Sequence, residues 1–237
     1  MEKPSGLING WDSIARHYSG EHTIKRRVTD PVFLEMVGNV VGLSVLDVGC
    51  GDGHICRVLK GKGASCVGVD ISTEQIKKAK GFEDGIAYHV MDALDISKLG
   101  LEFDKVIMDF LLCNLKSRAD LESVVLAASS KLKPLGELIF STSHPCFKGE
   151  WKDFESTPVQ DYFETGKKYE IRIRSNGCWV VFSNFHYTLE DYFQALRNAW
   201  FFVVDLKEPK SDDIDLLPFN YPPALLVKAI KGLTKRI

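Results

Sequence analysis

Several features that mark particular classes of protein are missing from this 237-residue sequence. No apolar stretch approaches the roughly 18 to 20 residues that a membrane-spanning helix needs. The segment Met1–Gly10 lacks the charged region and following apolar run of a secretory signal. We find no CxxC pair, no Cys/His group with metal-ligand spacing, and no internal repeat. These absences predict a cytoplasmic protein with no membrane helix and no bound metal ion.

An excess of charge of one sign is also missing. The chain has 30 basic and 32 acidic residues, a formal net charge of −2 and an isoelectric point near 6.3. Binders of nucleic acids or membrane surfaces are usually basic, so this balance argues against both. Cys50, Cys66 and Cys113 lie within or beside apolar runs, where a reduced cysteine packs as a small buried side chain. The length suits one large domain over residues 1–237.

What the sequence does contain is an alternation of short β-rich runs and helical segments. Helices begin near Gly53, Ser72 and Arg118, and two more are predicted over 9–18 and 28–40. This alternation predicts a doubly wound α/β fold, in which a mostly parallel sheet is covered on both faces. The five β-rich runs are Ser44–Val48, Ser65–Val69, Ile86–Val90, Phe103–Met108 and Gly136–Ser141.

Two later segments depart from this alternation. The runs Phe201–Leu206 and Ala224–Ile230 are strand-like, and we expect them to pair as an antiparallel edge of the sheet. Residues 145–187 form an insertion with a hairpin pattern, because Tyr169–Arg174 and Cys178–His186 flank an Asn-Gly turn. We therefore expect a cap that covers one end of the sheet.

The strongest chemical signal is the segment Val45–Gly53, VLDVGCGDG. A buried strand ends there in glycines at alternate positions, Gly49, Gly51 and Gly53, and a helix follows at once. Glycine lets a ligand lie against the main chain, and a helix N-terminus presents free N–H groups to it. A tight strand-to-helix turn with no ligand is the alternative, and the acidic residues described next argue against it.

The acid Asp47, inside the first strand, distinguishes between two cofactors. Dinucleotide-binding loops of the form GxGxxG also follow a first strand, but the spacing here is GxGxG. A carboxylate at Asp47 would repel a diphosphate and would attract an ammonium group. The methionine part of S-adenosylmethionine carries such an ammonium group. The charge therefore favours this methyl donor over a nicotinamide dinucleotide.

Acidic residues also close the next three strands. Asp70 lies about twenty residues past the glycine loop, where a carboxylate can accept both ribose hydroxyl protons, and Ile71 would flank the adenine. Asp92 and Ala93 follow the third strand and are suited to the adenine amino group and ring. Asp109 ends the fourth strand. Each acid alone could be a helix cap or a solvated turn residue, but open α/β sheets bind ligands at these strand ends.

Together these residues resemble the class I methyltransferases that use S-adenosylmethionine. The resemblance is close over 43–143 and looser through the C-terminal helix and last two strands. It implies a seven-stranded sheet of order 3-2-1-4-5-7-6, with strand 7 antiparallel. It also implies that the glycine loop wraps the methionine part, that Asp70 holds the ribose and that Asp92 contacts the adenine. The expected cofactor-binding residues are Tyr18, Asp47, Gly49, Cys50, Gly51, Gly53, Asp70, Ile71, Asp92, Ala93 and Asp109.

The methyl acceptor is expected on the side of the insertion. Residues 145–200 hold just over half of the chain's aromatic residues in under a quarter of its length. These form the small core of the cap, or at least three of them line an apolar acceptor pocket. A base is needed only if the acceptor must first lose a proton; the candidates are His144, after the fifth strand, and His186, at the end of the hairpin. Residues 1–42 are expected to form a helical lid, from which Tyr18 contacts the cofactor.

The resulting hypothesis is methyl transfer from S-adenosylmethionine to an O or N atom of a small, apolar or aromatic acceptor. A peptide-borne acceptor is an alternative, because the edge of a hairpin can add a strand. No nucleic-acid partner is expected, since no basic and aromatic stripe accompanies the neutral charge. Two other classes stay open, an NAD-dependent oxidoreductase and a non-catalytic partner protein that binds the cofactor.

Overall fold

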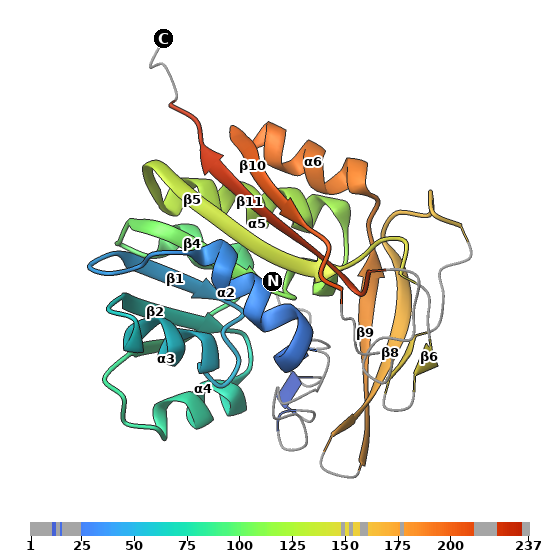
Figure 1. Ribbon diagram of the computed structural model, residues 1–237, viewed down its shortest axis with the longest axis horizontal. Helices are drawn as coiled ribbons and strands as arrows, with labels where there is room; N and C mark the ends of the chain where they lie inside the picture. The colour runs from blue at the N-terminus through green and yellow to red at the C-terminus, as the bar shows by residue number, and fades with distance from the viewer. Residues whose placement is uncertain are drawn as a thin grey trace, which may run out of the picture.

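The β-rich runs form a seven-stranded mixed sheet at the centre of the molecule (Figure 1). The computed structural model describes residues 11–12, 15, 25–147, 150–151, 154–156, 161–175, 178–210 and 222–233. The strands are β1 (Ser44–Val48), β2 (Ser65–Asp70), β3 (Ala87–Val90), β4 (Phe103–Asp109), β5 (Leu132–Ser143), β10 (Phe201–Lys207) and β11 (Ala224–Lys231). Their order is β3-β2-β1-β4-β5-β11-β10, and β11 alone runs in the direction opposite to the other six strands. This confirms the predicted sheet.

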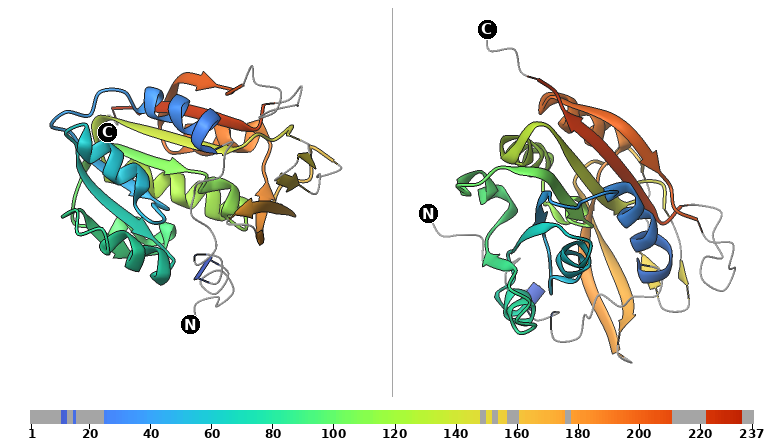
Figure 2. Two further views of the ribbon diagram at one scale, coloured as in Figure 1. Left: turned by 60° about the horizontal axis from the view of Figure 1, so that its bottom comes forward. Right: turned by 60° about the vertical axis from the view of Figure 1, so that its left-hand side comes forward.

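Helices cover both faces of the sheet (Figures 1 and 2). One face carries α2 (Asp30–Val37), α3 (His54–Gly61) and α4 (Thr73–Lys80), and the other carries the 3-10 helix η2 (Ala93–Lys98), α5 (Arg118–Lys131) and α6 (Leu189–Asn198). In β4, the Ile107 side chain belongs to the hydrophobic core between the sheet and α2, α3 and α4. The neighbouring Val106 and Met108 belong to the core on the other face, with η2, α5 and α6. Strands buried on both faces need apolar residues at successive positions, which explains the continuous apolar runs of the sequence.

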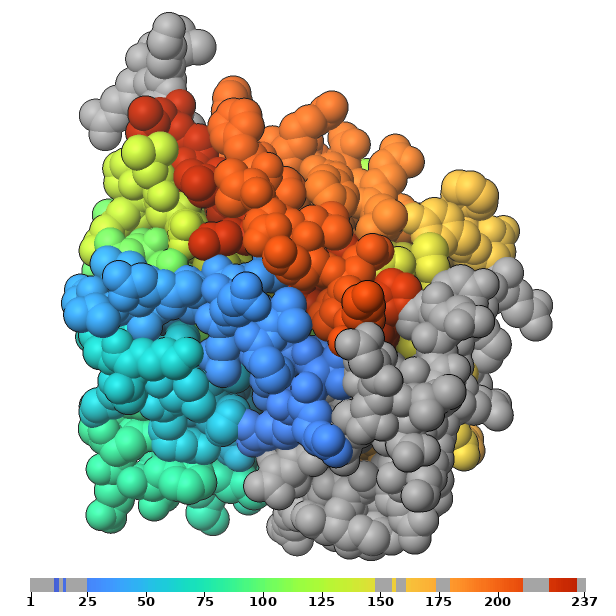
Figure 3. Space-filling model, viewed as in Figure 1, coloured from blue at the N-terminus to red at the C-terminus, as the bar shows by residue number. Residues whose placement is uncertain are grey.

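The N-terminal part of the described chain packs on the first face. The π-helical turn η1 (Lys25–Thr29) leads into α2, which packs against β5 and β11 and lies beside α3 in the space-filling view (Figure 3). The helix predicted over 28–40 ends earlier, at Val37, because Gly38 takes a φ of 70°. Of the helix predicted over 9–18, only residues 11, 12 and 15 are described, and they are helical. None of the helices in the described ranges is long and apolar enough to span a membrane.

The insertion contains a second sheet, which Figure 1 shows beyond the carboxyl ends of β4 and β5. Its antiparallel strands are β6 (Glu150–Trp151), β7 (Phe154–Ser156), β8 (Lys167–Ser175) and β9 (Cys178–His186). The pairing of β8 with β9, from Lys167 opposite His186 to Ser175 opposite Cys178, is the predicted hairpin. The predicted turn residues Asn176 and Gly177 lie outside the described residues.

Candidate active site

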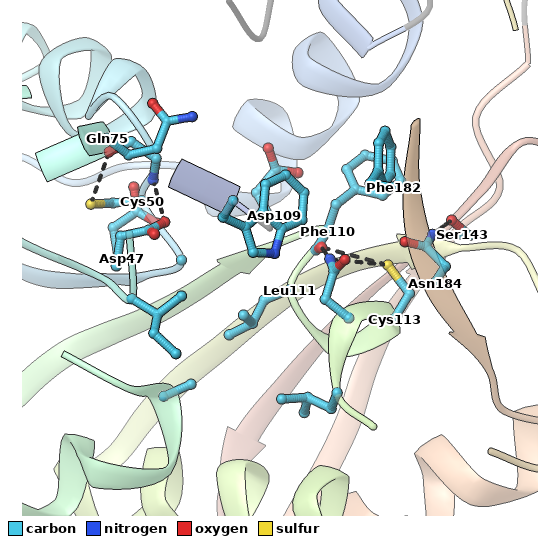
Figure 4. Close-up of a pocket in the computed structure, with 18 of the residues that line it drawn as sticks. Asp47, Cys50, Gln75, Asp109, Phe110, Leu111, Cys113, Ser143, Phe182 and Asn184 are labelled. Atoms are coloured by element: carbon cyan, nitrogen blue, oxygen red, sulfur yellow. Dashed lines mark hydrogen bonds between the residues drawn. The ribbon is translucent and has the colours of Figure 1, made fainter. Parts of the chain in front are cut away.

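The carboxyl ends of β1, β2 and β4 border a cavity of about 370 Å³ (Figure 4). Its strand-end half is lined by residues within 25–75 and 91–109, and its hairpin half by residues within 110–184. In Figure 4, Asp47, Cys50 and Gln75 lie on one side, and Ser143, Phe182 and Asn184 lie on the other. The main sheet, the second sheet and the N-terminal segment therefore meet at one cavity.

Two glycines of the loop after β1 have different tasks. Gly51 has a φ of +55° and lines the cavity, and nothing lies within 4 Å of the point where a β carbon would stand. Gly53 has a φ of +78° and caps α3, and a β carbon there would lie 2.4 Å from the Tyr88 hydroxyl oxygen. Both backbone conformations favour glycine. Gly51 therefore opens the cavity to the main chain, whereas Gly53 lets α3 begin close to Tyr88 of β3.

Asp70, the last residue of β2, anchors this loop. Its Oδ2 accepts a hydrogen bond from the backbone N–H of Gly51 at 2.9 Å, and its Oδ1 accepts one from Ser72 at 2.8 Å. Burial raises the pKa of the carboxyl, and these two hydrogen bonds act against the rise. Asp70 lines the cavity, and a carboxylate oxygen can accept more than one donor. The Asp70 carboxylate can therefore bind hydroxyl groups of a ligand while it holds the loop.

Gln75, on α4, adds a second acceptor to the strand-end half. Its side chain lines the cavity and is 5% exposed. Its Oε1 is buried and has no hydrogen-bond partner among the described residues. Because an unpaired buried carbonyl is costly, this atom fits a ligand that brings a donor.

Asp47 is buried within β1, where it lines the cavity and is 2% exposed. Burial raises the pKa of its carboxyl to about 7, while the Cys56 thiol, which donates to Oδ2 at 3.3 Å, acts against the rise. Removing a carboxylate from water disfavours its charged form unless a cation compensates. The Asp47 side chain is thus suited to a cationic group of a ligand.

The raised pKa of Asp47 gives a pH-dependent prediction. An acid whose native pKa lies above its unfolded value stabilises the fold below about pH 4, and this contribution is lost as the pH rises through about 7. An Asp47→Asn variant without cofactor should therefore be more stable than the wild type at pH 8 by about 2–4 kcal/mol, and equally stable near pH 4. Urea unfolding at both pH values measures this. A stability difference that does not change with pH would contradict the assignment.

Asp109, at the end of β4, is held by other residues of the protein. Lys25 Nζ lies 2.5 Å from its Oδ2, and Ser141 Oγ donates to its Oδ1 at 2.5 Å. Lys25 also pairs with Asp30 at 2.6 Å, and Lys25 and Arg26 both line the cavity. Sequence reasoning missed these two cations, although a run of three basic residues begins at Lys25. Asp109 therefore faces the cavity as part of an ion pair rather than as an isolated acid.

His54, the first residue of α3, lies at the same part of the cavity and was also missed. Burial lowers the pKa of its imidazole to about 4, and the charges of Arg26 and Lys25 lower it further. The ring is therefore neutral at physiological pH. Lys25 and Arg26 at this end of the cavity both pair with Asp30, and the several N–H donors of the Arg26 guanidinium also suit a carboxylate of a ligand.

Asp92 caps the 3-10 helix η2, because its Oδ1 accepts a hydrogen bond from the backbone N–H of Leu94 at 3.0 Å. Its neighbour Ala93 and the residue Ile71 line the same half of the cavity. Gly53 is not among the residues that line the cavity, and Tyr18 lies outside the described residues. The expected cofactor residues that the structure brings to the cavity are Asp47, Gly49, Cys50, Gly51, Asp70, Ile71, Asp92, Ala93 and Asp109.

The hairpin half of the cavity is mainly apolar, with polar or charged side chains at Asn114, Lys116, Asp120, Ser143 and Asn184. Its apolar lining includes Leu111, Phe147, Ile171, Ile173 and Phe182. Trp11 also lines the cavity, and its ring centroid lies 5.6 Å from that of Phe182. The N-terminal segment therefore meets the hairpin beside the cavity.

The aromatic residues of 145–200 divide between lining and core. Among the side chains that the structure describes, Phe147 and Phe182 line the cavity, one fewer than the three expected. Tyr187 and Tyr192, the second of which belongs to α6, instead pack in the core. The side chains of Trp151, Phe154 and Trp179 lie outside those described.

The two expected bases are not among the residues that line the cavity. His144 Nδ1 accepts a hydrogen bond from the backbone N–H of Cys146 at 3.1 Å, and its Nε2 lies 2.9 Å from Glu208 Oε1. Burial lowers the pKa of His144, and the hydrogen bond to Glu208 acts against the fall. His186 Nε2 lies 2.8 Å from the Tyr162 carbonyl oxygen. Both imidazoles hold loop backbone, so the structure does not bring the predicted bases to the cavity.

Comparisons with known proteins agree with this architecture. A protein-family model described as a methyltransferase domain matches residues 21–207. The ubiquinone biosynthesis O-methyltransferase of Chromobacterium violaceum is 30% identical over 147 residues, which cover 60% of this chain and 61% of that enzyme. The match thus spans less than two thirds of the relative's length.

Solved structures are similar over more of the chain. An S-adenosylmethionine-dependent methyltransferase from Mesorhizobium loti is 26% identical with a TM-score of 0.65, covering 85% of this chain and 96% of that one. A putative S-adenosylmethionine-dependent methyltransferase from Listeria monocytogenes shares the fold, with 23% identity, a TM-score of 0.66 and coverage of 86% and 96%.

The fold and the strand-end half define a Rossmann-like methyltransferase. Because the family model matches well over half of its length, the chain belongs to the methyltransferase-domain family. It is an enzyme, and its cofactor is S-adenosylmethionine. The prediction from the glycine loop and Asp47 is thereby confirmed, and the nicotinamide alternative is wrong.

Proposed function

We propose that this enzyme transfers a methyl group from S-adenosylmethionine to an O or N atom of a small, apolar or aromatic acceptor. The observation that carries the proposal is the division of one cavity into a polar strand-end half and an apolar hairpin half. An acceptor in the hairpin half lies next to a cofactor in the strand-end half. The name of the Chromobacterium violaceum relative favours oxygen as the acceptor atom.

The strand-end half fits the chemistry of the cofactor. In the proposal, Asp70 and Gln75 bind ribose hydroxyls, and Ile71, Asp92 and Ala93 surround the adenine. The main chain of Gly49, Cys50 and Gly51, which is open at Gly51, faces the methionine part. Asp47 attracts its ammonium group and Lys25 and Arg26 attract its carboxylate. The cofactor residues in this proposal are Lys25, Arg26, Asp47, Gly49, Cys50, Gly51, Asp70, Ile71, Gln75, Asp92 and Ala93.

The bound cofactor supplies an electrophilic methyl group, and the protein's task is to align the acceptor and exclude water. The contact of Trp11 with Phe182 supports a closed cavity, with residues 1–42 as a lid and 145–187 as a cap on a single domain. His144 and His186 are engaged with loop backbone. In this proposal the rate acceleration therefore comes from alignment of the acceptor with the methyl group, and not from proton removal by these histidines.

Titration and turnover test the proposal in two stages. Isothermal titration should show that S-adenosylhomocysteine binds and NADH does not. S-adenosylhomocysteine release is then measured with 2-naphthol and 2-(aminomethyl)naphthalene, which present oxygen and nitrogen on the same apolar body. Turnover of either supports the proposal. Cofactor binding without turnover of either naphthalene would contradict the small apolar acceptor, and turnover of a peptide instead would favour the peptide-borne alternative.

A further inference from the structure

Asn184 places an amide in the apolar wall of the hairpin half. It lies on β9 and lines the cavity together with Phe182, and it is 2% exposed. Across the strand pair, Phe182 stands opposite Ile171, and Asn184 stands opposite Tyr169. A polar side chain at so buried a position is costly unless its groups are hydrogen-bonded.

Within the part of the chain that the structure describes, only the nitrogen of this amide is engaged. Nδ2 donates to Ser143 Oγ at 3.0 Å and lies 3.4 Å from the Tyr169 hydroxyl oxygen. Oδ1 is buried and has no hydrogen-bond partner among the described residues. Figure 4 shows the nitrogen of Asn184 toward Ser143 and its oxygen on the side of Cys113. The side chain is thus fixed by its nitrogen, while its buried oxygen is left without a partner among the described residues.

Asn114 repeats this arrangement from a different element. It ends the 3-10 helix η3 (Leu112–Asn114) and lines the same cavity. Its Nδ2 donates to the Phe110 carbonyl oxygen at 2.5 Å, whereas its buried Oδ1 has no partner in the described part of the chain. Buried polar atoms in native proteins are nearly always paired, so two orphaned acceptors on residues of one cavity call for a donor that the described residues do not supply.

We propose that the amide oxygens of Asn184 and Asn114 form a subsite that selects acceptors carrying a hydroxyl or N–H donor on an apolar body. This inference rests on the proposed function, because it places the acceptor in the hairpin half. An ether, ester or halide in place of the donor leaves the amide oxygens unpaired. A site built to bind a hydroxyl discriminates strongly against an analogue that lacks it. Asn184 and Asn114 are therefore specificity-determining residues, and molecules with only acceptor groups are excluded.

The test compares two probes of similar size on the enzyme loaded with S-adenosylhomocysteine. The probes are 2-naphthol, which has one hydroxyl donor, and 2-fluoronaphthalene, which has none. The ratio of their dissociation constants is measured for the wild type, Asn184→Leu, Asn114→Leu and Asn184→Asp. Asn198→Leu is the matched control, because it makes the same change at an exposed position of α6.

At least one leucine variant should shift this ratio by about 10-fold or more toward the fluoro compound. The fluoro compound leaves the buried asparagine oxygen unpaired in the wild type, and the leucine variant has no such oxygen. Asn184→Asp, which keeps an acceptor oxygen, and Asn198→Leu should leave the ratio within about 3-fold of the wild type. The subsite is refuted if neither leucine variant moves the ratio, or if the loaded wild type binds neither naphthalene. A leucine variant that fails to fold leaves the other to decide.

Affinity for S-adenosylhomocysteine, measured in the same samples, separates the two levels of inference. A wild type that does not bind it would refute the proposed function. A wild type that binds it, but whose probe ratio is insensitive to both leucine substitutions, would refute the subsite alone.

Discussion

Replacing Asp70 with asparagine should weaken the binding of S-adenosylhomocysteine by about 30- to 100-fold. A hydrogen bond to a charged group contributes about 1.5–3 kcal/mol, and the substitution removes the charge that the ribose hydroxyls would meet. Asparagine is nearly the same size as aspartate and keeps one oxygen to accept the backbone N–H of Gly51 or Ser72. The loop should therefore survive the change, and isothermal titration measures the loss of affinity.

Asp205→Asn provides the control for this prediction, because Asp205 lies on the edge strand β10 with a side chain 40% exposed. It should bind S-adenosylhomocysteine as the wild type does. If Asp70→Asn also binds with unchanged affinity, Asp70 does not hold the ribose and serves only to anchor the loop.

A Gly53→Ala substitution should lower the free energy of unfolding by about 2–5 kcal/mol. The left-handed backbone at Gly53 costs a β carbon about 1–2 kcal/mol, and overlap with the Tyr88 hydroxyl adds about 1–3 kcal/mol. In a chain of this size, each kcal/mol shifts Tm by about 2–4 °C, so thermal unfolding followed by circular dichroism measures the effect.

Gly51→Ala separates backbone strain from steric overlap. Gly51 also has a positive φ, but its β carbon would enter open space in the cavity. Its Tm should fall by only about 2–8 °C from the strain alone, while its affinity for S-adenosylhomocysteine should fall because the methyl group narrows the cavity. An equal loss of stability in the two variants would contradict the different tasks assigned to the two glycines.

The strand-end half of the site could be predicted because it depends on local sequence and sheet topology. Asp47, Asp70, Asp92 and Asp109 all lie at or near the ends of parallel strands, and parallel strands bring those ends to one edge. Their partners are harder to predict. Asp109 pairs with Lys25, which comes from a π-helical turn far away in the sequence.

The hairpin half could not be predicted, since its residues act through long-range packing. His144 has the position expected of a base, but its nearest acid is Glu208, which follows β10. Tyr192 and Phe182 are equally aromatic in sequence, yet the first is core and the second lines the cavity. Only the register of β8 with β9 shows which side chains of the hairpin share a face.

The position of β11 in the sheet affects how the chain folds on the ribosome. β11 is the last of the described strands to be synthesised, but it lies between β5 and β10. Synthesis from Ser143 to Lys231 takes roughly 4 to 18 s at about 5–20 residues per second. Until β11 emerges, β5 has one strand neighbour, and the apolar β10, FFVVDLK, has none. Unpaired strands of this kind are templates for pairing between chains, so the nascent protein is most exposed to aggregation during this interval.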